Sequence, residues 1–163
     1  MSLPDVVLPG TDEQDLNLAS LEGTWVICIY LMTGRPGVPL PGGWDDIPGA
    51  GGCTPQSCSF RDHHDELQRL GSGVFGLSAQ TTDYQREARD RLHLPFELLA
   101  DPSLLLKHAL RLSTFTVAGM ELFKRLTLII RNGPIIKVFY PVYLSDRNVS
   151  DVLAWLTANT NEF

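Results

Sequence analysis

Apolar runs at four places along the chain predict β-strands. Residues 24–31 (TWVICIYL) and 73–78 (GVFGLS) are short and apolar throughout, which is typical of buried strands. Residues 126–130 (LTLII) and 135–141 (IIKVFYP) form a second pair of such runs. These two are joined through Asn132-Gly133, a dipeptide that favours a tight turn. The pattern predicts two buried strands and, later in the chain, a β-hairpin.

Four other segments have the composition of helices: 54–70, 82–91, 101–110 and 148–159. The first carries Pro55 in its first turn, where proline is tolerated because the N–H that it lacks has no partner there. The third opens on Asp101, followed by proline and serine, which are residue types found at helix starts. The fourth opens on Asn148, predicted as its N-cap, with Asp151 three residues later.

The order strand, helix, strand, helix, hairpin, helix predicts an α/β fold. The central strands are apolar throughout, as expected when helices cover both faces of a sheet. We therefore expect a central mixed sheet flanked by helices, and a thioredoxin-like architecture is one of several that fit. A chain of 163 residues is long enough for one domain with a real core, so we predict a single domain over residues 1–163.

One stretch, residues 34–52, is predicted to be a long loop inserted in this domain. It contains seven glycines and four prolines in nineteen residues, and proline removes hydrogen-bond donors while glycine raises the entropic cost of ordering. Long loops in compact domains are usually functional or disordered. Trp44 and Ile47 offer apolar anchors and favour an ordered loop. Such a loop would form one side of a substrate pocket.

Composition and charge exclude several classes of protein. The hydrophobic fraction is 44%, and no apolar run approaches the roughly 20 residues needed to span a bilayer. The net charge of −6 with scattered basic residues argues against nucleic-acid binding. The N-terminal residues lack the pattern of a secretion signal, so we expect a cytoplasmic protein whose three cysteines are kept reduced.

The candidate chemistry lies in two of these cysteines, Cys53 and Cys58. Cys53 stands just ahead of the helix predicted over 54–70. The unpaired N–H groups and the positive end of the dipole at a helix start stabilise an anion, so we expect the pKa of the Cys53 thiol to be lowered. Five residues of α-helix rise roughly 7.5 Å and rotate about 140°, which puts the two Cα atoms about 8.5 Å apart. A disulfide needs about 4.4–6.8 Å, so the pair bonds only if the helix start unwinds.

Other interpretations of these cysteines are open on the residues alone. Cys58 is equally well read as a small buried apolar residue, which is a common fate of a helical cysteine. A zinc site built from the cysteine pair and His63-His64 lacks the usual ligand spacing, and the two histidines fit a solvated helix face. Cys28 lies in the middle of the first apolar run and is predicted to be core. We expect no metal site.

The segment GCTPQSCSFRD (52–62) resembles the active-site segment of Q-type peroxiredoxins, also called bacterioferritin comigratory proteins. Their motif reads roughly Gly-Cys-Thr-x-x-x-Cys-x-Phe-Arg-Asp. The resemblance extends through residues 74–103, with their LPFELLADPS segment, and through KRLTLIIRNGPIIKVFY (124–140), which is similar to the family's Arg-x-Thr strand and hairpin. It covers most of the chain and implies the thioredoxin-like fold of the alkyl hydroperoxide reductase and thiol-specific antioxidant superfamily.

The resemblance also implies roles for individual residues. Cys53 corresponds to the peroxidatic cysteine, which becomes a sulfenic acid, and Cys58 to the resolving cysteine, which forms an intrachain disulfide with it. Arg125 matches the arginine that reaches the thiolate and the peroxide, where a guanidinium lowers the thiol pKa and offers a planar fork. Gln56 falls where the family often has a side chain that holds this arginine. Without the resemblance, Arg125 reads as a surface strand residue paired with Glu121.

The chain departs from the family just before Cys53. Peroxiredoxins usually carry Pro-x-x-x-Thr-x-x-Cys there, and the threonine hydroxyl binds the peroxide. The corresponding residues are Asp46 and Ala50. We expect either Thr33 or the backbone N–H groups of the glycine loop, at Gly52 and its neighbour, to supply the missing donor, because glycine allows the close approach of bare backbone.

The function implied is a thioredoxin-dependent, atypical two-cysteine peroxidase. It would reduce hydrogen peroxide and organic hydroperoxides without metal, haem or flavin, and thioredoxin or a similar dithiol would return the electrons. Because the resolving cysteine lies in the same chain, a monomer is favoured over a homodimer. Two alternatives are a protein disulfide oxidoreductase, favoured by the missing threonine, and a non-enzymatic redox sensor whose helix unwinding signals to a partner.

Overall fold

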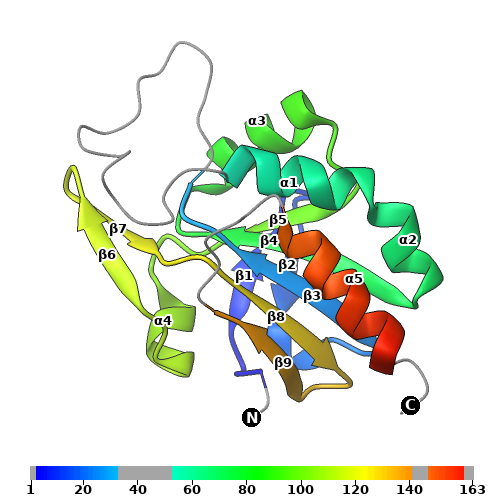
Figure 1. Ribbon diagram of the computed structural model, residues 1–163. Helices are drawn as coiled ribbons and strands as arrows, with labels where there is room; N and C mark the ends of the chain where they lie inside the picture. Colours follow the sequence, from blue (N-terminus) through cyan, green and yellow to red (C-terminus); the bar gives the residue numbers. More distant parts are fainter. Residues whose placement is uncertain (1–2, 33–52, 141–146, 160–163) are drawn as a thin grey trace.

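The structure, a computed structural model, describes residues 3–32, 53–140 and 147–159. Its centre is a five-stranded mixed sheet in the order β5-β4-β3-β8-β9 (Figure 1). The strands β3 (Thr24–Ile29), β4 (Ser72–Ser78) and β5 (Glu97–Ala100) are parallel, whereas β8 (Leu126–Arg131) and β9 (Ile135–Phe139) are antiparallel to their neighbours. The predicted central mixed sheet is therefore confirmed, with β5 as an additional strand.

Four helices cover one face of the sheet: α1 (Cys53–Asp62), α2 (His64–Arg69), α3 (Thr82–Leu92) and α5 (Asn148–Asn159). The core between them and the sheet includes Val26 and Cys28 from β3, Phe60 from α1 and Val152 from α5. The intervening residue Ile27 points into a second core on the opposite face, because side chains alternate along a strand. Cys28, 5% exposed, is core as predicted.

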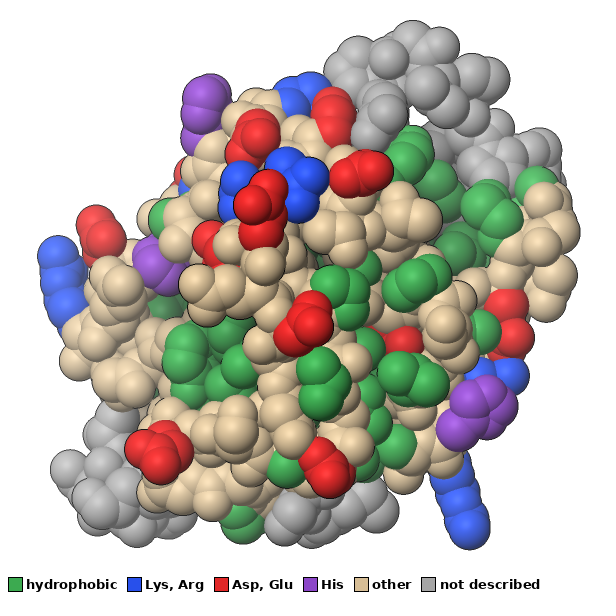
Figure 2. Space-filling model, turned by 180° about the vertical axis from the view of Figure 1, so that it is seen from behind, with side chains coloured by type: hydrophobic (Ala, Val, Ile, Leu, Met, Phe, Trp, Pro, Cys, Tyr) green, Lys and Arg blue, Asp and Glu red, His purple; other side chains and the backbone are tan. Residues whose placement is uncertain are grey.

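The opposite face is covered by short elements. These are the hairpin of β1 (Val7–Pro9) and β2 (Asp15–Asn17), the 3₁₀ turn η1 (Leu18–Ser20) and α4 (Leu105–Leu110). Seen from this side, apolar side chains are scattered among acidic and basic ones (Figure 2). No helix within the described ranges has the length and apolar character to cross a bilayer.

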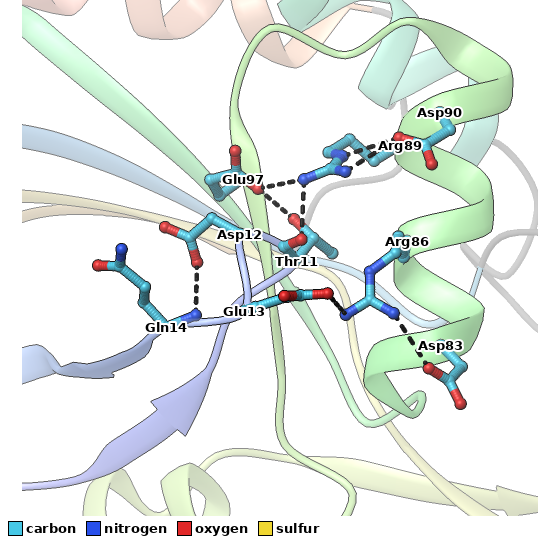
Figure 3. Close-up of polar contacts among 9 residues, drawn as sticks. All are labelled: Thr11, Asp12, Glu13, Gln14, Asp83, Arg86, Arg89, Asp90 and Glu97. Atoms are coloured by element: carbon cyan, nitrogen blue, oxygen red, sulfur yellow. Dashed lines mark hydrogen bonds and ion pairs between the residues drawn. The ribbon is translucent and has the colours of Figure 1, made fainter.

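The segment after β1 closes the edge of the sheet at β5. Gly10 forms an isolated bridge with Leu99, and the N–H of Thr11 donates to the carbonyl of Leu98 at 3.0 Å. Arg89 on α3 donates from Nη1 to the Thr11 carbonyl at 2.9 Å and to Glu97 at 2.8 Å (Figure 3). An exposed strand edge invites pairing with another chain, so these contacts protect the edge.

A further hairpin, β6 (Thr114–Val117) and β7 (Met120–Phe123), forms a two-stranded sheet of its own beside the central one (Figure 1). Its turn is Ala118-Gly119, whose φ angles of 50° and 77° are both positive, as tight hairpins require. The sequence patterns did not predict this hairpin or the β1–β2 hairpin.

Three predicted helices differ in detail from the structure. The helix over 54–70 is broken at His63 (φ −108°, ψ 12°), and the change of direction lets α2 bury Leu67 completely. The helix over 101–110 begins only at Leu105, because both carboxylate oxygens of Asp101 accept bonds from the N–H groups of its first turn, at 2.8 and 2.9 Å. The last helix has the predicted bounds, but Asn148 lies inside it as its first residue.

Candidate functional site

The start of α1 is the centre of the candidate site. Cys53 is the first residue of this ten-residue helix, which begins one residue earlier than predicted, so it lies within the turn whose backbone N–H groups lack helical partners. Thr33, Gly52 and the rest of the loop predicted over 34–52, including Trp44, lie outside the described residues. The structure therefore describes the helix on which both cysteines lie, but not the loop that precedes it.

Arg125 comes to this helix from the connection between β7 and β8. Its Nη1 donates to Oε1 of Gln56, in the first turn of α1, at 2.5 Å. Both side chains are buried, with 4% and 1% of their surface exposed. The interpretation of Arg125 as a surface residue paired with Glu121 is wrong, because Glu121 contacts Lys107 and Thr114 instead.

Two further buried side chains extend this contact. Nε2 of Gln56 donates to Oδ1 of Asn148, the first residue of α5, at 3.0 Å. The same oxygen accepts a bond at 2.7 Å from the hydroxyl of Thr127 on β8. Sequence reasoning missed both residues: Asn148 was predicted only as a cap. The available signal was Thr127, a lone hydroxyl within the apolar run LTLII.

Cys58 is a free, half-buried thiol on the same helix. It lies near Arg61, whose pKa is raised first by a hydrogen bond with Asp62 and further by the proximity of Cys58, against an opposing effect of burial. Phe60, 1% exposed, packs into the core. Because α1 is continuous from Cys53 to Asp62, the helical spacing of about 8.5 Å between the two cysteine Cα atoms applies, and a disulfide requires the helix to unwind.

The third cysteine and the histidines lie elsewhere. Burial raises the pKa of the Cys28 thiol far above its ordinary value, while its hydrogen bond with Thr127 and the nearby charge of Arg125 act in the opposite direction. Nδ1 of His63 lies 3.7 Å from Oε1 of Glu66, and the ring centroids of His64 and Phe96 are 6.0 Å apart. Within the described part of the chain, no cluster of three or more histidine, cysteine or acidic side chains is arranged to hold a metal ion.

A cavity of about 340 Å³ opens at the carboxyl ends of the parallel strands. It lies between the segments that follow β3, β4 and β5 and the β6–β7 hairpin. Its lining is mostly apolar and is formed by Met32, Ala79, Gln80, Thr81, Tyr84, Pro102, Met120, Glu121 and Leu122. Ligands of open α/β sheets commonly bind at this end of the strands.

Solved structures with a similar fold include peroxiredoxins. The peroxidoxin BcpB of Mycobacterium tuberculosis matches with a TM-score of 0.77 and 21% identity, over 97% of this chain and 95% of that one. A peroxiredoxin Q of Xanthomonas campestris matches with a TM-score of 0.75 and 19% identity, over 96% and 92%. The thioredoxin-like fold expected from the sequence is thus confirmed.

Sequence relatives lead to the same group. Peroxiredoxin Bcp of Bacillus subtilis is 25% identical over 94% of this chain and 90% of its own length. Peroxiredoxin bcp1 of Schizosaccharomyces pombe is 30% identical over 61% of this chain, and a putative chloroplastic peroxiredoxin Q of Oryza sativa subsp. indica is 37% identical over 60%. The chain spans only 45% and 39% of the length of these last two relatives.

A model of the Redoxin family matches residues 1–156, almost the whole chain. This match agrees with the peroxiredoxin Q and Bcp names of the relatives and with the peroxiredoxin folds of the solved structures. The chain belongs to the Redoxin family, and its cysteine motif resembles that of the Q-type, Bcp-like peroxiredoxins found among its relatives.

Proposed function

We propose that this protein is a thiol peroxidase in which Cys53 reacts with the peroxide. The observation that carries the proposal is the buried contact between Arg125 and Gln56, in the first turn of the helix that begins at Cys53. Residues three positions apart lie on neighbouring parts of a helix surface, so this bond holds the guanidinium at the turn that carries position 53. The peroxiredoxin names of the relatives support a peroxidase.

The first step is attack by the Cys53 thiolate on one oxygen of the peroxide. The S–O bond forms as the O–O bond breaks, and the departing oxygen takes a proton to leave as water or an alcohol. Sulfur is oxidised to a sulfenic acid and the peroxide is reduced. Positive charge at the helix start and on Arg125 stabilises both the thiolate and the negative charge that develops on the leaving oxygen.

Cys58 completes the cycle in this proposal. After the first turns of α1 unwind, the Cys58 thiol loses its proton and its thiolate attacks the sulfenic sulfur. The S–S bond forms as the S–O bond breaks, and the departing hydroxide takes up a proton to leave as water. Thioredoxin or a similar dithiol then reduces the disulfide by exchange. Because Cys58 belongs to the same chain, the cycle needs no second subunit, and a monomer is sufficient.

The substrates proposed are hydrogen peroxide and organic hydroperoxides. The apolar walls of the cavity near the β6–β7 hairpin support the second class, because they offer a surface for an organic group. A Bcp protein of Xanthomonas campestris is described as active in alkyl peroxide reduction, and it shares the fold of this chain.

The test is peroxide consumption by the purified protein with thioredoxin, its reductase and NADPH. We expect consumption by the unmutated protein and none by Cys53→Ser. Ala50, at the position of the family threonine, favours the second candidate, a protein disulfide oxidoreductase. Reduction of a protein disulfide without peroxide consumption would establish that candidate and overturn the first.

A further inference from the structure

Four buried polar side chains form one line of hydrogen bonds that ends at Arg125. The guanidinium donates to Gln56 at 2.5 Å, Gln56 donates to Asn148 at 3.0 Å, and the hydroxyl of Thr127 donates to the same oxygen at 2.7 Å. Each of these side chains is at most 4% exposed, so water does not compete for their bonds.

The fixed end of this line is Thr127. It lies on β8 between β3 and β9, paired with Cys28 and Phe139, and none of its surface is exposed. Its hydroxyl has one proton, which it donates to Oδ1 of Asn148.

The amide of Gln56 must have a defined orientation to serve Arg125. An amide has one acceptor oxygen and one donor NH₂ group, whereas a guanidinium has donors only. If the Gln56 amide rotated by half a turn, its NH₂ would face the guanidinium and the bond would be lost. The oxygen of Asn148 prevents this rotation, because it offers the NH₂ group its acceptor on the side away from Arg125.

We propose that Asn148 is a positioning residue of the peroxidase site, which acts through Gln56 to hold the guanidinium of Arg125 at the start of α1. This inference rests on the proposed function, because the role is defined at the peroxidase site, but its test measures the reactivity of the thiol and does not require peroxidase activity. The thiolate of Cys53 is stabilised by a correctly placed guanidinium, so displacement of Arg125 raises the pH at which Cys53 becomes reactive.

The test measures the rate of alkylation of Cys53 by iodoacetamide as a function of pH. It uses a Cys58→Ser background, in which the remaining cysteine besides Cys53 is the buried Cys28. Asn148→Ala is expected to move the midpoint of the profile upward by about 0.5–1 pH unit and to slow the reaction with peroxide roughly 3- to 10-fold. Asn132→Gly is the control, because it removes an asparagine side chain at the opposite end of β8.

A double-mutant cycle separates positioning from general damage. If Asn148 acts through Gln56, the Asn148→Ala change has no further effect on the midpoint in a Gln56→Ala background. A merely structural role gives the same effect in both backgrounds and overturns the proposal. Thr127→Val tests the same line without changing α5, and we expect a smaller upward shift that also disappears with Gln56→Ala.

The two proposals fail in different ways. Peroxide consumption with an unchanged alkylation profile in Asn148→Ala and Thr127→Val overturns the role of Asn148 and leaves the peroxidase in place. A shifted profile in a protein that consumes no peroxide supports the role of Asn148 at the thiol and overturns the peroxidase.

Discussion

Arg125 and Gln56 are joined by a buried hydrogen bond of 2.5 Å between Nη1 and Oε1. The bond connects the segment before β8 with the first turn of α1, which are 69 positions apart in the sequence. Because a buried guanidinium that loses an acceptor is costly, the pair ties the position of α1 to that of Arg125. If α1 unwinds for disulfide formation, this bond must break, so resolution and loss of the arginine contact are linked.

Replacement of Arg125 by lysine tests whether the planar fork matters beyond its charge. Lysine keeps the charge but has a single ammonium group, which cannot donate to Gln56 and to a peroxide in the same way. We expect kcat/KM for hydrogen peroxide to fall roughly 10- to 100-fold in Arg125→Lys, measured in the coupled thioredoxin assay. Lys124→Ala, at the exposed neighbouring position, serves as the control and should retain the rate of the unmutated protein.

Replacement of Cys58 by serine tests its role as the resolving residue. In mass spectrometry, the mass of the unmutated protein should fall by about 2 Da after one equivalent of peroxide, because two hydrogens are lost when the disulfide forms. A disulfide-linked peptide should join positions 53 and 58. Cys58→Ser should instead gain about 16 Da as a sulfenic acid and should not turn over with thioredoxin. The variant Ser59→Ala, on the same helix, should behave like the unmutated protein. A linked peptide that joins Cys53 to Cys28 would contradict the assignment of Cys58.

Most of the central sheet was predictable because its strands are continuous apolar runs, as in LTLII before the Asn132-Gly133 turn. The bounds of the last helix were predictable, since its apolar positions and first-turn Asp151 are local signals. The β6–β7 hairpin was missed because its strands are only partly buried and do not alternate cleanly. Its turn, with Ala118 at a positive φ, lacks the asparagine or aspartate that usually marks such turns.

The candidate site was only partly predictable, for a related reason. Cys53 was singled out by its place at the start of a predicted helix, whereas Arg125 was found only through resemblance, since nothing local distinguishes a buried arginine from a surface one. Asn148 reads as a helix cap from its neighbours alone, and its contact with Gln56 spans 92 positions. Pairings of this kind depend on how α1, α5 and β8 pack together, which hydrophobic periodicity does not specify.

Substitution of Met120 tests the cavity as a site for organic hydroperoxides. Met120 lines the cavity from β7 and is 37% exposed, so Met120→Trp fills space there with little change to the core. We expect KM for cumene hydroperoxide to rise several-fold, whereas KM for hydrogen peroxide stays unchanged because that molecule needs no apolar surface. Met120→Ala is the matched variant and should leave the bulky substrate at least as well accommodated. Equal effects of Met120→Trp on both substrates would show that the cavity does not discriminate between them.

The pH dependence of stability tests the contact between α4 and the β6–β7 hairpin. The carboxylate of Glu121 accepts hydrogen bonds from Lys107 and Thr114, which lower the pKa of Glu121 below its ordinary value of 4.5. A depressed pKa in the folded state adds stability above pH 4.5, and this contribution is lost as the pH falls through the folded-state value.

In urea unfolding, Glu121→Gln should therefore be less stable than the unmutated protein near neutral pH, and the difference should shrink below pH 4.5. Glu22→Gln, at an exposed position, is the control for removal of one acidic charge. A difference between Glu121→Gln and the unmutated protein that does not change with pH would show that the carboxylate contributes no ionic interaction there.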